Sequence, residues 1–241
     1  MDGYVDLLDD LLGATCTQKE VNEEKPERGA CALDLVVAGD VHGLARLLKD
    51  DPDFGINARN PATGRSLLHE GCARGEMEIV KFLLQRTEAD LTLRTMLGRC
   101  TPLHLAVTNN HRPIVFLLLS HGADASSRDR FACSPLHYVK SLSVAKLLVQ
   151  YGGKSLDYNA KKKQAVESVS SFVESISKDR SIPVAERDAA LENCKGLVKY
   201  LEKQAEVEYR VKLERLREQK KQTTALASTI SRRKKQAQSI K

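Results

Sequence analysis

The sequence predicts an all-α fold: a short solenoid of stacked helix pairs, followed by a helical bundle or one long C-terminal helix. Three observations favour this fold. A four-residue box recurs at nearly constant spacing, as SLLH at 66–69, TPLH at 101–104 and SPLH at 134–137. Apolar residues follow each box at helical spacing. Aromatic residues make up only 5% of the 241 residues, which argues against a large β-sandwich and fits helices packed through leucine, valine and alanine.

The boxes define a repeat. Their histidines, His69, His104 and His137, are separated by 35 and 33 residues, and a period near 33 is that of ankyrin repeats. The segments that begin at Gly64 and Gly98 superpose after one inserted residue. Residues 31–154 therefore resemble the ankyrin-repeat family, with about four units, of which the first and the last are irregular.

Each part of the repeat has a physical role in the predicted helix pair. The serine or threonine of the box is expected to cap a first helix with its hydroxyl group, and a proline in the next position suits a first helical turn. The sequences EIVKFLL and PIVFLLL supply the apolar stripe of a second helix. Gly122 and Gly152 stand where a helix is expected to end in a left-handed conformation.

The box histidines are the obvious candidates for chemistry. The ankyrin resemblance instead implies that they hydrogen-bond the backbone of the turns, and no residue that breaks the repeat offers them a catalytic or metal-binding partner. The six cysteines form no CxxC pair, and no glycine-rich phosphate loop is present. We therefore expect no catalytic residue, no cofactor and no metal, and a protein that is not an enzyme.

The outer units depart from the pattern. The unit that begins at Cys31 has Leu33 in place of the box histidine and is expected to be a capping repeat. In the last unit, Leu147 follows His137 by 10 residues, whereas Leu117 follows the preceding box histidine by 13. Three residues are missing between the paired helices, so we expect a shorter first helix or a tighter turn, with stacking ending there.

The resemblance also implies a concave surface of turn tips and first helices that binds a protein partner. Arginines with a few apolar anchors are typical of interaction hot spots, so we expect an acidic protein segment to bind. The alternative is that an arginine near the turn glycine is ordinary ankyrin sequence, and further arginines lie at nearby turns (Arg59, Arg94 and Arg128). The implied contact residues are Arg65, Arg74, Met96, Leu97, Arg99, Thr108, Asn109, Arg130 and Phe131.

Residues 1–30 form an acidic N-terminal segment with a short amphipathic helix. Residues 1–28 carry eight acidic and three basic residues, a net charge of −5, and no basic region typical of a signal peptide. Leu7, Leu8, Leu11 and Leu12 share one helical side, and residues 8–12 match an LxxLL motif. Leu8, Leu11 and Leu12 are candidates for docking in a partner's groove; packing on the chain's own repeats is the alternative.

Residues 155–222 are expected to be helical. An apolar stripe from Val166 to Ile176 is followed by the interruption KDRSIP, and Pro183 can open a second helix with a stripe from Leu191 to Leu201. No glycine or proline follows Leu197 as far as Leu226, which allows one long helix; a short coiled coil is an alternative.

The stretch SFVESISKDRSIPVAERDAALENCKGLVKYLE resembles the C-terminal helical lid of the seventy-kilodalton heat-shock chaperones. The resemblance implies no ATPase, since the nucleotide domain of those chaperones has no counterpart in the sequence. Ankyrin repeats followed by such a lid resemble a small ankyrin-repeat protein associated with cilia and centrosomal structures. That likeness implies a cytoskeletal setting.

Residues 223–241 form a basic tail that contains the cluster Arg232, Arg233, Lys234 and Lys235. Residues 203–241 carry twelve basic and four acidic residues, a net charge of +8, which suits an acidic polymer such as the tubulin surface. A simply solvated tail, a nuclear import signal and a nucleic-acid contact are the alternatives. Nucleic acid is the less expected partner because no aromatic residue for base stacking accompanies the cluster.

Together, these features predict a non-enzymatic scaffold whose repeats bind a protein and whose C-terminal helices and tail anchor it in a larger assembly, such as the ciliary or flagellar axoneme. The alternative is a nuclear or nucleic-acid-associated adapter. Dispersed cysteines favour a reducing compartment, the cytoplasm. No apolar run approaches the roughly 20 residues of a membrane span, so no membrane partner is expected.

Overall fold

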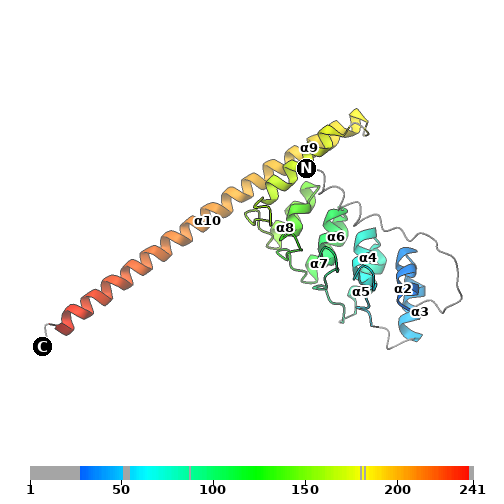
Figure 1. Cartoon of the computed structure of the whole chain (residues 1–241), viewed down its shortest axis with the longest axis horizontal. Coiled ribbons are helices and arrows are strands. Elements are labelled where there is room, and N and C mark those ends of the chain that lie inside the picture. The colour runs from blue at the N-terminus through cyan, green and yellow to red at the C-terminus, as the bar shows by residue number, and fades with distance from the viewer. Residues whose placement is uncertain (1–27, 51–54, 87, 180, 182, 239–241) are drawn as a thin grey trace.

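The computed structural model describes residues 28–50, 55–86, 88–179, 181 and 183–238, and all regular elements within these ranges are helices (Figure 1). In chain order the helices are α2 (Arg28–Val37), α3 (Val41–Asp50), α4 (Leu67–Arg74), α5 (Met77–Leu84), α6 (Pro102–Thr108), α7 (Arg112–Ser120), η1 (Pro135–Tyr138), α8 (Leu142–Gln150), α9 (Ala165–Lys178) and α10 (Val184–Gln238).

The helices form two parallel rows. The first helix of each unit packs on the first helix of the next, in the order α2, α4, α6 and η1, and the second helices α3, α5, α7 and α8 stack beside them. This arrangement confirms the predicted all-α solenoid. It follows from the sequence period, because a helix pair of this size cannot bury its apolar face alone and must stack on its neighbours.

The core of the stack lies between the two rows, and the apolar stripe of the second helices supplies a large part of it. The same three positions are buried in the second, third and fourth units: Ile79, Val80 and Leu83; Ile114, Val115 and Leu118; Val144, Ala145 and Leu148. In α3 of the first unit only Leu44 is buried. Full burial of an aliphatic side chain of this size stabilises the fold by roughly 1.5–3 kcal/mol. The stripes predicted from EIVKFLL and PIVFLLL therefore supply much of the driving force for stacking.

The helix ends also follow the sequence. In α4 the Ser66 hydroxyl accepts the N–H of His69 at 3.4 Å, and Pro102 and Pro135 stand at the first positions of α6 and η1. Gly122 and Gly152, which follow α7 and α8, have φ values of 89° and 93°, a left-handed conformation that glycine adopts without a steric penalty.

The fourth unit contains the shortened helix that the spacing predicts. η1 is a single 3₁₀ turn of four residues, whereas α6, its counterpart in the preceding unit, has seven residues. Val139 then adopts an extended conformation with ψ of 133°. The three missing residues are thus taken from the first helix, and α8 keeps its full length of nine residues.

Stacking does not end at the fourth unit, contrary to our expectation. The turn before α9 repeats the preceding turns: the N–H of Ala160 donates to Phe131 O at 2.8 Å, as the N–H of Arg130 donates to Gly98 O at 2.9 Å. α9 packs on η1 and α10 packs on α8. The pair therefore adds a fifth layer, and the stack is continuous across the boundary predicted between residues 154 and 155.

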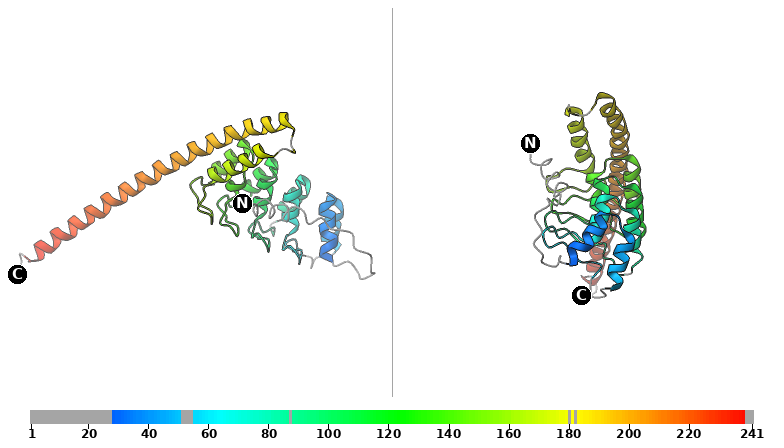
Figure 2. Two further views of the ribbon diagram at one scale, coloured as in Figure 1. Left: turned by 45° about the horizontal axis from the view of Figure 1, so that its top comes forward. Right: turned by 90° about the vertical axis from the view of Figure 1, so that its right-hand side faces the viewer.

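α10 is one continuous helix of 55 residues. It contains no proline and a single glycine, Gly196, and it projects far beyond the repeats (Figures 1 and 2). Near its start Cys194, Leu197 and Leu201 are buried against the stack. The segment predicted as a basic tail continues this helix as far as Gln238. None of the helices in the described ranges combines the length and apolar character that crossing a membrane requires.

Candidate protein-binding surface

The turns that join one unit to the next project from the stack, and their tips are hydrogen-bonded to one another. The N–H groups of Met96, Arg130 and Ala160 each donate to a carbonyl of the preceding tip, at 3.1, 2.9 and 2.8 Å. We call the side chains on the last three tips the fingertip row: Met96, Leu97, Arg99, Arg130, Phe131, Lys161 and Lys162. The backbone ladder holds this row in a fixed geometry.

One residue in each tip has a positive φ. It is a glycine in the first tip, Gly64 at 68°, but Arg99, Ala132 and Lys162 in the next three, at 52°, 56° and 58°. A left-handed conformation costs an L-residue roughly 1–2 kcal/mol. The stack therefore holds the backbone of each tip in a conformation that is unfavourable for an isolated chain, which indicates a rigid surface.

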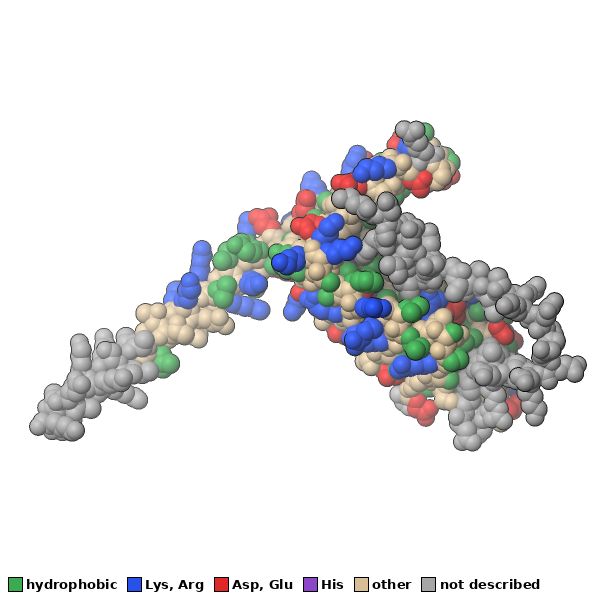
Figure 3. Space-filling model, viewed as in Figure 1, with side chains coloured by type: hydrophobic (Ala, Val, Ile, Leu, Met, Phe, Trp, Pro, Cys, Tyr) green, Lys and Arg blue, Asp and Glu red, His purple; other side chains and the backbone are tan. Residues whose placement is uncertain are grey.

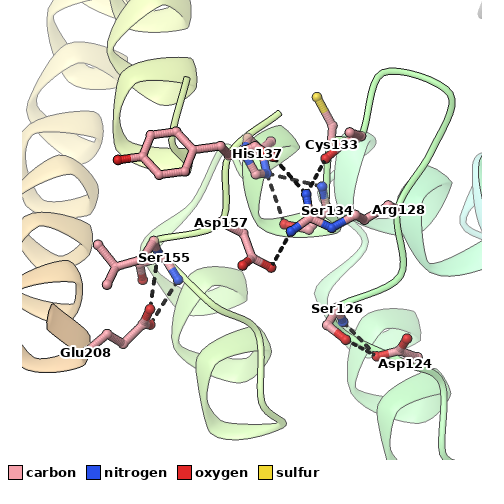
Figure 4. A network of polar contacts seen from close by, with 12 residues as sticks. Asp124, Ser126, Arg128, Cys133, Ser134, His137, Ser155, Asp157 and Glu208 are labelled. Carbon is pink, nitrogen blue, oxygen red and sulfur yellow. Dashed lines mark hydrogen bonds and ion pairs between the residues drawn. The ribbon is translucent and has the colours of Figure 1, made fainter. Parts of the chain in front are cut away.

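The three box histidines connect the units from inside. Nδ1 of His69 accepts the N–H of Ser66 at 3.2 Å, and its Nε2 lies 3.0 Å from the carbonyl oxygen of Cys100 in the next unit. His104 repeats this pattern, with Nε2 3.2 Å from Cys133 O. His137 (Figure 4) repeats it with Nε2 3.3 Å from Lys163 O. Since Nδ1 accepts a hydrogen bond, Nε2 carries the proton and donates it to the carbonyl group.

The surroundings of these histidines keep them neutral. Burial lowers the pKa of His69 and of His104 to about 4 and also lowers that of His137. Both ring nitrogens are engaged in the turns, so neither is available to attack a substrate or to bind an ion. The geometry confirms the structural role that the resemblance implied.

Polar side chains fix the tips of the last two turns. Oδ1 of Asp129 accepts the N–H groups of Phe131 and Cys133 at 2.8 and 2.9 Å, and Oδ1 of Asn159 accepts those of Lys161 and Lys163, both at 2.9 Å. Asn159 thus replaces an aspartate of the repeat. This equivalence of turn residues is the signal that could have identified Lys161 and Lys162, which our sequence analysis missed.

Two of the turn arginines link neighbouring units. Arg94 donates to the carbonyl oxygen of Arg128. Arg128 donates to Tyr158 O at 2.7 Å and pairs with Asp157 at 3.0 Å (Figure 4). Arg94 and Arg128 are therefore parts of the scaffold rather than free cations for a partner.

Several predicted contact residues have intrachain partners. Glu70 pairs with both Arg65 at 3.2 Å and Arg74 at 2.8 Å. Thr108 donates to His104 O at 2.8 Å, and Asn109 donates to Ala73 O in the preceding unit at 2.9 Å. These four residues lie on or beside the first helices, apart from the fingertip row, and their role in binding stays a prediction.

The fingertip row brings together the other predicted residues. Met96 and Leu97 are each 63% exposed, although both are apolar and their backbone is fixed. Arg99 and Arg130 are exposed beside them, and Phe131 is half-buried. In Figure 3 basic side chains are spread over the visible face of the repeats and along α10. Exposed apolar anchors among arginines are the composition of a protein-interaction hot spot.

For the remaining predicted contacts, the structure gives only the backbone position of the basic cluster. Leu8, Leu11 and Leu12 lie outside the described residues. The backbone of the cluster from Arg232 to Lys235 is helical, in the last turns of α10. It stands about 36 Å along the helix axis from Glu208, at roughly 1.5 Å per residue.

The described part of the chain offers no metal centre. No group of three or more histidine, cysteine, aspartate or glutamate side chains there is placed to hold an ion. Cys72, Cys100, Cys133 and Cys194 form no disulfide and are buried. Burial raises the pKa of Cys72 and Cys194, and raises that of Cys100 to about 12, so these thiols stay protonated and pack as small apolar groups.

Comparison with known proteins agrees with this architecture. A family model for ankyrin repeats in three copies matches residues 30–129. Among the relatives, the chain is 33% identical over 103 residues to mouse palmitoyltransferase ZDHHC13, which covers 42% of this chain and 16% of that protein. It is 38% identical over 126 residues to human SMC5-SMC6 complex localization factor protein 1, covering 51% of this chain and 12% of the relative.

A third relative is the Drosophila melanogaster transient receptor potential cation channel subfamily A member 1, 32% identical over 144 residues, or 57% of this chain and 12% of the channel. The chain thus spans less than a fifth of the length of each of these three relatives. The similarity concerns a small part of each relative, and the activities named in those proteins are not transferred by it.

Proposed function

We propose that this chain, in which residues 30–129 match ankyrin repeats, a protein-interaction module, is a non-enzymatic scaffold that binds an acidic, partly apolar protein segment along the fingertip row. The observation that carries the proposal is the exposure of Met96 and Leu97, 63% each, on tips held by a continuous backbone ladder. Exposed apolar side chains contribute little to the folded core, whereas on a rigid backbone they can bury apolar area against a partner.

Binding would draw on two physical effects. Aliphatic side chains of the partner would remove Met96 and Leu97 from water, at roughly 25 cal/mol per Å² of apolar area buried. Arg99 and Arg130 would pair with carboxylates around these anchors, which favours acidic partners and speeds association. Because the ladder and the box histidines fix the tips beforehand, little conformational freedom is lost on binding.

The proposal can be tested in the full chain by charge reversal. Arg99→Glu with Arg130→Glu should reduce recovery of repeat-dependent partners at least tenfold in affinity purification, while far-UV circular dichroism is unchanged. Arg112→Glu is the matched control, because Arg112 is exposed on α7 in the second row. Equal recovery by the double variant and by wild type would remove the fingertip row as the binding site.

The C-terminal helix supplies a second element of the proposal, an anchor in a larger assembly. Its support is the projection of α10 beyond the stack (Figure 2) and the net charge of +8 over residues 203–241. A cytoskeletal lattice with an acidic surface, such as tubulin in a ciliary or flagellar axoneme, is complementary to this charge. The proposed location is accordingly the cytoplasm, in an axoneme or a centrosomal structure. A short coiled coil along α10 would be a further means of attachment.

The alternative is a nuclear or nucleic-acid-associated adapter. It is favoured by the cluster from Arg232 to Lys235 and by the name of one relative, a localization factor of the SMC5-SMC6 complex. Binding to generic duplex DNA separates the two proposals. A steep fall in affinity between 50 and 200 mM salt, on the order of a thousandfold, supports the adapter; no binding at low salt eliminates it.

A further inference from the structure

A groove lies where the fourth and fifth layers meet. It has a volume of about 610 Å³, and its lining includes Lys140, Leu142, Phe172, Ile176, Ala190 and Cys194. It is separate from the fingertip row, because its lining comes from the turn before α7, from the turn between η1 and α8 with the start of α8, and from α9 and α10. The small side chains of Ala190, Cys194 and Gly196 on α10 leave it open.

The shortened fourth unit explains why the groove exists. α9 has 14 residues, but η1, on which it packs, has only four. The far half of α9 therefore extends beyond the helix beneath it, which leaves Phe172 and Ile176 half-buried. A first helix of seven residues, as in α6, would have continued below this half. Apolar side chains without a partner above or below are typical of a docking surface.

Lys140 gives the groove a charge preference. Its ammonium group lies 5.7 Å from the centre of the Phe172 ring, and the surrounding protein displaces water and lowers its pKa. Neighbouring lysines have acidic partners: Lys195 pairs with Glu192 at 2.8 Å and Lys178 with Glu174 at 3.8 Å. Lys140 forms no ion pair with any carboxylate of the described residues. Glu192 also lines the groove, but its carboxylate is paired with Lys195. The groove therefore suits an occupant that carries a carboxylate for Lys140 beside aliphatic side chains.

We propose that the acidic N-terminal segment of this same chain is that occupant, with Leu8, Leu11 and Leu12 against Phe172 and Ile176, and an aspartate on Lys140. The segment combines both required features: residues 1–28 have a net charge of −5, and YVDLLDDLL alternates leucine pairs with aspartates. A leucine-bearing amphipathic helix in an apolar groove is an established mode of recognition. The proposal is independent of the function proposed for the fingertip row.

The segment is long enough to reach the groove. Fifteen residues lie between Leu12 and Arg28, the start of α2, and the sixteen residue-to-residue steps of an extended chain span up to about 55 Å. Four layer-to-layer steps lead from α2 to α9, and at helix spacings of 8–10 Å they amount to roughly 40 Å. Docking within one chain is therefore geometrically feasible.

Photo-crosslinking in the full chain tests the proposal. The photoreactive residue p-benzoylphenylalanine replaces Leu7, which leaves the three docking leucines in place, and mass spectrometry maps the products. We expect crosslinks within one chain to α9 and to the turn containing Lys140. Lys140→Glu should reduce their yield at least fivefold, as should Leu8→Asp with Leu11→Asp.

Lys146→Glu is the matched control, because Lys146 also lies over an aromatic ring, that of Tyr200 at 6.0 Å, but outside the groove lining. It should leave the yield unchanged. Should Lys140→Glu lower the helicity, Lys140→Gln replaces it. Crosslinks between two chains, crosslinks to other helices, or a yield insensitive to both Lys140 variants would each overturn the proposal.

Discussion

Acid should destabilise the repeats through the buried box histidines. Burial lowers the pKa of His69 and His104 to about 4, whereas histidine in an unfolded chain has a pKa near 6.5. Below pH 6.5 the unfolded state therefore binds more protons than the folded state. The free energy of unfolding must fall as the pH decreases from about 6.5 toward 4.

The size of this effect follows from the two pKa values. Between pH 7.5 and pH 5.0 each histidine with a folded pKa of about 4 lowers the free energy of unfolding by ~2 kcal/mol. His69 and His104 together therefore contribute about 4 kcal/mol, and His137, whose pKa is also lowered, adds in the same direction. This is a large fraction of the roughly 5–15 kcal/mol that stabilises an ordinary domain.

Urea unfolding followed by circular dichroism at pH 7.5, 6.0 and 5.0 measures the effect. His104→Gln removes one titrating group. Between pH 7.5 and 5.0 its free energy of unfolding should therefore fall by ~2 kcal/mol less than that of wild type. His121→Gln is the control, because His121 is exposed, and it should keep the wild-type dependence. A free energy of unfolding equal at pH 7.5 and 5.0, or an undiminished dependence in His104→Gln, would refute the reasoning.

Three further predictions follow from burial and hydrogen bonding. Leu118→Ala should reduce the free energy of unfolding by about 2–5 kcal/mol in urea titrations, while Phe116→Ala, two residues away and 51% exposed, should change it by under about 0.5 kcal/mol. Glu208→Ala should accelerate amide hydrogen exchange at the two backbone N–H groups that its carboxylate binds at 2.9 and 3.1 Å; unchanged exchange would mean that this contact does not hold α10 on the stack. Cys72 and Cys100 should react with iodoacetamide only after unfolding, since burial raises the pKa of both thiols; rapid alkylation at pH 7.5 would contradict their burial.

The sequence predicts best what is decided locally. The box histidines recur in phase with their capping residues, so their positions and their structural role could be inferred before any contact was seen. The shortened η1 could be inferred as well, because three residues are missing between His137 and Leu147. The continuity of α10 beyond Leu197 could be inferred because neither glycine nor proline follows as far as Leu226.

The fifth layer could not be predicted in the same way. Gln164 and Glu167 replace the serine and the histidine of the box, yet the N–H of Gln164 still donates to Glu167 Oε2 at 3.2 Å. Whether α9 stacks on η1 is decided by contacts between distant residues, which no local pattern contains. The same holds for Asn109, which a family correspondence assigns to a partner but whose amide donates to Ala73 O.

The fingertip row and the groove both favour acidic, partly apolar segments, so they are competing binding sites for the N-terminal segment. The cations of the fingertip row are exposed, and exposed ion pairs contribute at most about 1 kcal/mol each. Lys140 is exposed as well, but it stands beside the half-buried Phe172 ring and has no carboxylate partner among the described residues, and the groove around it adds apolar surface for the leucines. The groove is therefore the better site for the segment. Arg99→Glu with Arg130→Glu should leave the crosslinks of the segment intact, and Lys140→Glu should leave the partners of the fingertip row intact.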